Sequence, residues 1–217
     1  KPESSHHEQG PGQNEIDFRY SSPLRAGDDA VTFKAVVGTV AARSGLTADF
    51  GPRPLPGHPG NGMHINFSIR SGVGDDVMGS AIAGLLEHIG ELSLFLCGTE
   101  QSYERLGHFK SPRYISWSHE NRSQLIRIPA AQGEYRRAEL RSPDPLCNPY
   151  LAYALIIRAC LDGITRSLPL PPECDRNMLE EESDVARLPG SLGEAKKIAG
   201  ESEFLRSVLP QTVIEAY

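Results

Sequence analysis

The chain of 217 residues is long enough to bury a substantial hydrophobic core, so its size alone demands no disulfide bonds. Its 22 basic and 28 acidic residues give a net charge of -6, which argues against a general nucleic-acid-binding protein because no basic field exists to neutralise phosphates. Its apolar runs are too short to span a membrane, and its four cysteines include no C-x-x-C pair, so we expect reduced thiols and a cytoplasmic protein.

Two carboxylates near the start of the chain stand on either side of a turn. Glu8 and Glu15 flank the sequence Gly-Pro-Gly at 10–12, which excludes a helix and predicts a loop or hairpin. The two carboxylates could then converge on one point, where like charges need a cation, a proton or separation. An acidic surface loop explains the same residues, so both interpretations stay open.

The next hundred residues alternate between regular elements and one long loop. The alternation at 16–20 predicts a strand, and Asp28 and Asp29 predict the start of a core-packing helix that ends at Gly45. A short strand is expected at 46–50, followed by a surface or active-site loop at 51–62 that is rich in proline and glycine.

A histidine follows this loop and precedes a predicted strand at 65–70. The glycines beside His64 permit close approach of a ligand, and the imidazole is a reasonable metal ligand, although a lone histidine usually binds nothing. A long helix is then predicted over 77–96, with a core stripe of Ile82, Leu85, Leu86, Ile89, Leu92 and Leu96.

Arginines are concentrated between 102 and 141. They are Arg105, Arg113, Arg122, Arg127, Arg136, Arg137 and Arg141. Arg122 and Arg127 lie on opposite faces of a regular extended segment, or on one face across a bulge. Arg137, Glu139 and Arg141 alternate and so share one face of a predicted strand, either as a salt-bridge ladder or as a phosphate and carboxylate site with a metal-binding glutamate.

Helices are predicted for most of the remaining chain. Pro149 starts one that is capped by Asn148 or Asp144 and stopped at Asp162-Gly163, with its apolar face buried. An amphipathic helix is expected over 192–208, and a last helix starts near Pro210.

Read together and in order, these features resemble the catalytic domain of class I glutamine synthetase. The residues that carry the resemblance are His-His-Glu (6–8), Gly-Gln-Asn-Glu (12–15), Asp-Asp-x-x-Thr-Phe-Lys (28–34), Gly-x-Gly-Met-His (60–64), Ser-Tyr-x-Arg-Leu (102–106), Asn-Arg-Ser (121–123), Ile-Arg-Ile-Pro (126–129), Glu-x-Arg-x-x-Asp-Pro (139–145) and Asn-Pro-Tyr-Leu-Ala (148–152). The resemblance implies an α+β fold, an antiparallel sheet forming a partial barrel packed with helices, and a partial catalytic domain over 1–217.

The resemblance also implies roles for particular residues. Glu8 and Glu15 would bind one divalent metal, and His64 and Glu139 a second, either Mg2+ or Mn2+. Substrate glutamate would be bound by Gly60, Arg105 and Arg141, and ATP by Glu3, Ser68, Arg122 and Arg127, with Arg122 and Arg141 acting in catalysis. The implied reaction joins glutamate and ammonia to give glutamine through γ-glutamyl phosphate, with ATP as a substrate.

One departure from the family pattern affects the expected substrate. The family's flap after Tyr-x-Arg-Leu carries a glutamate that helps to deprotonate ammonium, and Lys110 stands at that place here. A cation there should repel ammonium. The alternatives are therefore a γ-glutamyl ligase for another amine, or a non-catalytic nucleotide-binding homologue.

The family resemblance also implies parts of the protein beyond these residues. Family members have an N-terminal β-domain and a C-terminal tail outside the region that matches 1–217, and their active sites lie between subunits of a ring-shaped homo-oligomer. The 217 residues alone are therefore expected to be inactive.

Overall fold

The computed structural model describes residues 1–69, 76–131, 133, 136–180 and 183–217. Within these ranges the helical elements are α1 (Pro23–Arg43), α2 (Asp76–Leu96), α3 (Glu100–Arg105), α4 (Pro149–Thr165), α5 (Leu192–Glu201), α6 (Glu203–Val208) and α7 (Gln211–Glu215). The strands are β1 (Pro2–His7), β2 (Asn14–Phe18), β3 (Ile65–Phe67), β4 (Trp117–His119), β5 (Ile126–Ile128) and β6 (Ala138–Leu140). The expected α+β class is confirmed.

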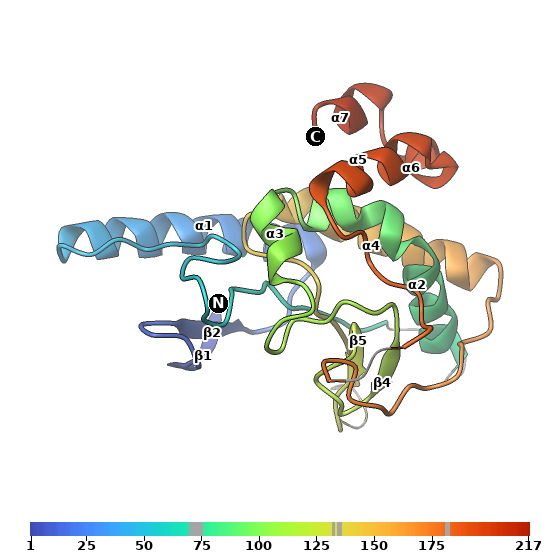
Figure 1. The fold of residues 1–217 in the computed structure, drawn as a ribbon, viewed down its shortest axis with the longest axis horizontal. Helices are drawn as coiled ribbons and strands as arrows, with labels where there is room; N and C mark the ends of the chain where they lie inside the picture. The colour runs from blue at the N-terminus through green and yellow to red at the C-terminus, as the bar shows by residue number, and fades with distance from the viewer. Residues whose placement is uncertain (70–75, 132, 134–135, 181–182) are drawn as a thin grey trace.

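The core lies where α2 and α4 pack against each other, with α5, α6 and α7 above them in Figure 1. All six residues of the predicted stripe on α2 are buried. The helices approach closely at two glycines: a Cβ on Gly84 would collide with the carbonyl oxygen of Ala159, and one on Gly163 with that of Ser80. Only glycine therefore fits at these two positions.

A four-stranded sheet in the order β3-β6-β5-β4 carries the short strands of the central region. β6 pairs antiparallel with both β3 and β5, whereas β4 and β5 are parallel, so the sheet is mixed and open. Ala138 and Leu140 have no exposed surface and face the core. Because side chains alternate along a strand, Glu139 faces the opposite way, as the sequence predicts.

A separate two-stranded hairpin, β1–β2, lies beside α1 (Figure 1). His6 is opposite Glu15 in its register, and Glu8 follows directly after β1, so the predicted hairpin is confirmed. Phe18 contacts Phe33 of α1 edge to face, with ring centroids 5.3 Å apart. This aromatic contact anchors the second strand to the helix.

Helix α1 differs from its prediction in both its start and its environment. It begins at Pro23, five residues before Asp28, because proline fits the first helical turn and Ser22 has the extended backbone of an N-cap. Gly27 is its one buried residue, and Val31, Val36 and Val40 are 43%, 53% and 56% exposed. The expectation of a core-packing helix was wrong for this chain.

Smaller corrections concern element boundaries. Residues 46–50 form no strand: the Leu46 N–H donates to the carbonyl of Ala41, and the carbonyl of Asp49 accepts from the side chain of Asn61. The strand predicted at 65–70 ends at Phe67, with position 70 outside the described residues. Helix α4 continues past Asp162 to Thr165, and the helix expected over 192–208 is broken at Ser202, whose side chain caps α6. The cap by Asn148 and the last helix after Pro210 are confirmed.

The four cysteines are free, and three of them are buried. Burial raises the pKa of Cys160 to about 12, which fits the expected reduced thiol in an apolar environment. Among the described helices, none combines the length and apolar character needed to cross a membrane.

Candidate functional site

The centre of the site is Glu139, whose carboxylate is buried among three basic side chains. Arg141 Nη1 donates to Oε1 at 3.1 Å, and His64 Nδ1 lies 3.1 Å from the same oxygen. Arg127, directly opposite Glu139 in the β5–β6 register, places its Nε 3.2 Å from Oε2. Of the row predicted from sequence, Glu139 and Arg141 are in contact, whereas Arg137 Nε donates to Asn66 Oδ1 at 3.2 Å. One arginine from the neighbouring strand and a histidine from the preceding loop complete the cluster.

The electrostatics of this cluster keep the carboxylate ionised. Burial alone would raise the pKa of Glu139, but the contact with His64 and the charges of Arg141 and Arg127 lower it to about 2. Burial lowers the pKa of His64, and the nearby guanidinium of Arg141 adds to this effect although Glu139 opposes it. His64 and the two arginines together keep the carboxylate of Glu139 ionised.

Several buried polar atoms of the cluster have no hydrogen-bond partner. Among the described residues these include Glu139 Oε2 and the Nε atoms of Arg105, Arg127 and Arg141. Arg127 and Glu139 are thus at ion-pair distance without the alignment of a hydrogen bond. Buried polar groups normally have partners, so these N–H groups could bind an anion and the carboxylate oxygen could bind a cation.

Arg105 lies beside the glycine-rich loop. Its side chain is 4% exposed, and Nη2 donates to the carbonyl oxygen of Ser142, next to Arg141. A Cβ on Gly60 would collide with the carbonyl of Pro52 and would lie 2.9 Å from Arg105 Cγ. A side chain is therefore excluded at Gly60, and the backbone there is held against the arginine.

The hairpin holds a second group of ligand-type atoms. His6 Nε2 lies 3.4 Å from Glu8 Oε1 and 3.6 Å from Glu15 Oε2, and one ligand atom from each residue falls within 4.8 Å of the others. Burial and the charges of Asp17 and Glu8 raise the pKa of Glu15, while His6 opposes them. The convergence predicted from the turn is confirmed, and the shortage of positive charge there favours a cation.

The remaining predicted site residues lie farther from Glu139 than the three basic side chains described above. Arg122 is exposed in a turn before β5, not in a regular strand, and its charge acts on Arg141. Glu3 is on β1 at a bulge, and its carboxylate is 3.9 Å from Arg19 Nε. Ser68 is exposed just after β3. The structure does not bring Glu3 and Ser68 into the Glu139 cluster.

Sequence reasoning missed two contacts that join the parts of the site. Gln13, in the hairpin turn, donates to the carbonyl of Gly60, and Arg141 Nη2 donates to the carbonyl of Lys110 at 3.2 Å. The second is a backbone contact with no signal in the sequence. The first had one signal, a glutamine directly after a Gly-Pro-Gly turn.

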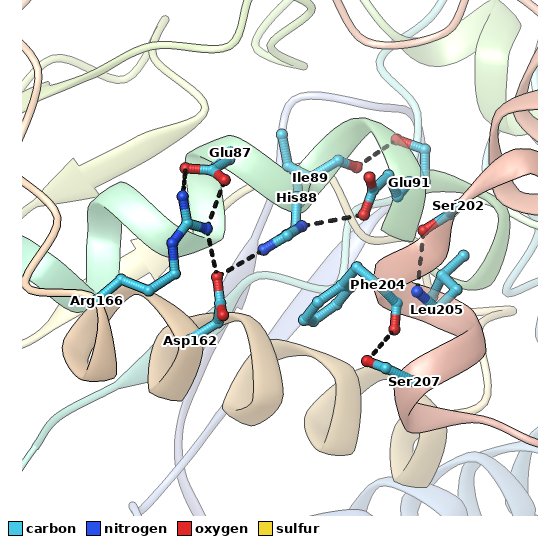
Figure 2. A network of polar contacts seen from close by, with 11 residues as sticks. Glu87, His88, Ile89, Glu91, Asp162, Arg166, Ser202, Phe204, Leu205 and Ser207 are labelled. Atoms are coloured by element: carbon cyan, nitrogen blue, oxygen red, sulfur yellow. Dashed lines mark hydrogen bonds and ion pairs between the residues drawn. The ribbon is translucent and has the colours of Figure 1, made fainter.

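A further set of ligand-type side chains, Glu87, His88 and Asp162, lies between α2 and α4 (Figure 2). Arg166 already neutralises it, with Nη1 2.6 Å from Glu87 and 2.8 Å from Asp162. His88 bridges Asp162 and Glu91, both at 3.0 Å, and stacks on Phe204 of α6. We therefore read this set as a structural network that joins three helices.

The fold and the site define a class: an α+β protein with clustered carboxylates and buried arginines. A family model described as the glutamine synthetase catalytic domain matches residues 1–217, and the chain belongs to this family.

Named relatives agree with the family assignment. The chain is 42% identical to a glutamine synthetase of Thermococcus kodakarensis, over 96% of this chain and 51% of the relative. It is 41% identical to one of Methanosarcina mazei, over 99% of this chain and 52% of the relative. The chain thus spans about half the length of the curated relatives it matches.

Solved structures give the same fold. Two titled "GmaS/ADP complex-Conformation 1" and "Apo GmaS without ligand" each superpose with a TM-score of 0.86 over 97% of this chain. Their sequence identities are 31% and 32%, and the match covers 53% and 52% of those chains.

Proposed function

We propose that the complete protein, meaning the full-length polypeptide that carries this chain, is an ATP-dependent carboxylate–amine ligase. The observation that carries the proposal is the buried cluster in which Arg127, Arg141 and His64 surround Glu139, with polar atoms left unsatisfied on both the acidic and the basic side. Membership of the glutamine synthetase family supplies the reaction type.

The residues present fit two divalent cations. His64 Nδ1 and Glu139 Oε1 are 3.1 Å apart, close to the separation of about 3 Å expected for adjacent ligands of an octahedral ion at about 2.1 Å. Glu8 and Glu15 would hold the other ion, which would relieve the repulsion that raises the pKa of Glu15. Mg2+ or Mn2+ bound there would neutralise phosphate oxygens of ATP and the carboxylate of the substrate.

Arginines of this chain would bind the anionic groups of the substrates. We assign Arg105 and Arg141, with the backbone at Gly60, to the glutamate, because both guanidinium groups are buried with an N–H unused. Arg122 and Arg127 would bind ATP together with Glu3 and Ser68. Arg122 and Arg141 would stabilise the charge that develops as the phosphoryl group moves to the glutamate side-chain carboxylate, giving γ-glutamyl phosphate.

The amine that completes the reaction is ammonia in the leading proposal. Lys110 gives reason to keep a second candidate, a γ-glutamyl ligase for another amine. Its side chain is exposed at the turn whose carbonyl is bound by Arg141, so its charge stands near the site that would receive ammonium. A non-catalytic nucleotide-binding protein is the third candidate.

We also propose that the complete protein forms a ring-shaped homo-oligomer in the cytoplasm and that the 217 residues alone are inactive. Support comes from α1, whose valines are exposed in the single chain, and from the match to half the length of the relatives. Steady ATP turnover by the isolated 217 residues would contradict the second statement.

The test is ATP hydrolysis by the complete protein with glutamate and Mg2+, comparing ammonium with a panel of primary amines. Ammonium-dependent glutamine formation supports the leading proposal, and turnover with another amine alone supports the second candidate. Nucleotide binding without turnover supports the third. Glu139→Gln should abolish turnover, while Glu104→Gln, at a largely exposed side chain, should leave it unchanged.

A further inference from the structure

The side-chain amide of Gln13 joins the hairpin to the glycine-rich loop. Its Oε1 accepts from the backbone N–H of Gly10 at 3.0 Å, within the hairpin turn. Its Nε2 donates to the carbonyl of Gly60 at 3.0 Å and to Asn61 Oδ1 at 2.8 Å, nearly fifty residues further along the chain. One planar group thus holds the hairpin turn and the loop together.

The orientation of this amide follows from its partners. A backbone N–H only donates and a carbonyl only accepts, so Gln13 must turn its oxygen to Gly10 and its nitrogen to Gly60. Asn61 obeys the same logic, since its Nδ2 donates to the carbonyls of Asp49 and Gly51, which leaves its oxygen for Gln13. The chain of hydrogen bonds has one consistent direction.

Each end of this bridge lies at a part of the proposed site. On the hairpin side, Glu8 N–H donates to the backbone carbonyl of Gln13, and Glu15 lies two residues beyond it. On the loop side, Gly60 has no room for a side chain and is pressed against Arg105. Because the amide contacts both segments, a shift of one changes the position of the other.

We propose that Gln13 is a positioning residue that couples cation binding at Glu8 and Glu15 to glutamate binding at Gly60 and Arg105. The identity of the two ligands rests on the proposed function. Coupling of this kind is reciprocal, so the factor by which glutamate raises the affinity for the cation equals the factor by which the cation raises the affinity for glutamate. Gln13 contributes to that factor and touches neither ligand.

The experiment measures Mn2+ binding to the complete protein by titration calorimetry, with and without saturating glutamate, and glutamate binding with and without Mn2+. In the wild type each ligand should strengthen the other on the order of ten-fold. In Gln13→Ala that factor should fall to about one, with each ligand alone bound within about three-fold of wild type. The matched control is Gln9→Ala, at an exposed glutamine of the same turn.

A second variant tests the same coupling if Gln13→Ala disturbs the turn. Gln13→Glu retains the acceptor for Gly10 N–H but replaces the donor that faces Gly60 by an oxygen, so it should also lose the coupling. Full coupling in both variants, or no coupling in a wild type that binds both ligands, overturns the inference. A wild type that binds neither Mn2+ nor glutamate refutes the proposed function itself, which is a different result.

Discussion

Replacing Glu139 by glutamine tests whether the buried carboxylate is the charge that holds the central cluster together. The substitution keeps the size of the side chain and removes its charge. Arg127 and Arg141 would then be two guanidinium groups at 16% and 4% side-chain exposure without their shared counter-ion. Breaking a buried ion pair by removing one partner typically costs about 3–5 kcal/mol, because the other charge stays buried.

The pKa of Glu139 gives a second measure of the same effect. It falls from an ordinary value of 4.5 to about 2 in the folded protein. At about 1.4 kcal/mol for each unit of pKa, this difference of about 2.5 corresponds to about 3 to 4 kcal/mol of stability at pH 7. Since the side chain is 9% exposed, solvent screens the interaction little. Both routes predict a loss of about 3 to 4 kcal/mol in Glu139→Gln.

The loss should depend on pH in one direction. Because the folded pKa is lowered, the contribution of Glu139 is complete above pH 4.5 and is lost as the pH falls through about 2. About 1 kcal/mol should therefore remain at pH 3. The assay is urea unfolding of the complete protein, followed by circular dichroism between pH 7 and pH 3, with a metal chelator and one fixed protein concentration.

The control for this series is Glu104→Gln. Glu104 pairs with Arg53 at 3.4 Å, but its side chain is 58% exposed, so the expected change is below about 1 kcal/mol at any pH. Equal losses in the two variants, or a loss in Glu139→Gln that stays constant from pH 7 to pH 3, would refute the reasoning.

Three further outcomes are expected. Lys110→Glu should raise kcat/KM for ammonium about ten-fold, since a local charge reversal is worth about 1.4 kcal/mol. The charge-matched control Lys196→Glu on α5 should leave kcat/KM unchanged. An unchanged value for Lys110→Glu counts against a role for the charge at this turn. The pKa of His88 is raised, so its stabilising contribution is complete below an unfolded pKa of about 6.5 and is lost as the pH rises through the folded pKa. The difference in unfolding free energy between wild type and His88→Asn should therefore shrink from pH 6 to pH 9. A constant difference argues against a stabilising imidazolium. Gly163→Ala should destabilise the protein by about 1–3 kcal/mol, because the added Cβ meets the backbone of the facing helix. Gly90→Ala, with open space around it, should be neutral or stabilise the protein by up to about 1 kcal/mol. Urea unfolding measures both changes.

An element could be predicted from the sequence where its local residue pattern agrees with its burial in the fold. Helix α2 was predicted within one residue because its apolar stripe faces a complete core. Helix α1 has a similar stripe, but Val31, Val36 and Val40 are 43%, 53% and 56% exposed. Periodicity alone does not distinguish a core from an exposed apolar face. The break at Ser202 was missed because a serine is equally compatible with a helix interior and with a cap.

The candidate site shows the same division. The row of Glu139 and Arg141 followed from strand alternation, and the hairpin carboxylates followed from the turn residues between them. The partners supplied by other segments, Arg127 across the sheet and His64 from the loop, need the strand register, which no local pattern specifies. The resemblance to a family supplied the pairing of His64 with Glu139 as an expectation, and their geometry agrees with it. It assigned Arg127 to ATP, so the contact of Arg127 with Glu139 was not expected.

The two proposed cation sites differ in how firmly they are held. Glu139 lies in a four-stranded sheet with core residues on either side of it, whereas the strands of the hairpin have no buried residue. The hairpin is joined to other segments by the Phe18–Phe33 contact, by the amide of Gln13 and by the ion pair between the Lys1 amino group and Asp29 of α1. Elements with few buried contacts open at low free-energy cost. We therefore expect ligands that bind at the hairpin to supply part of the energy that fixes it, in line with the coupling that we propose for Gln13.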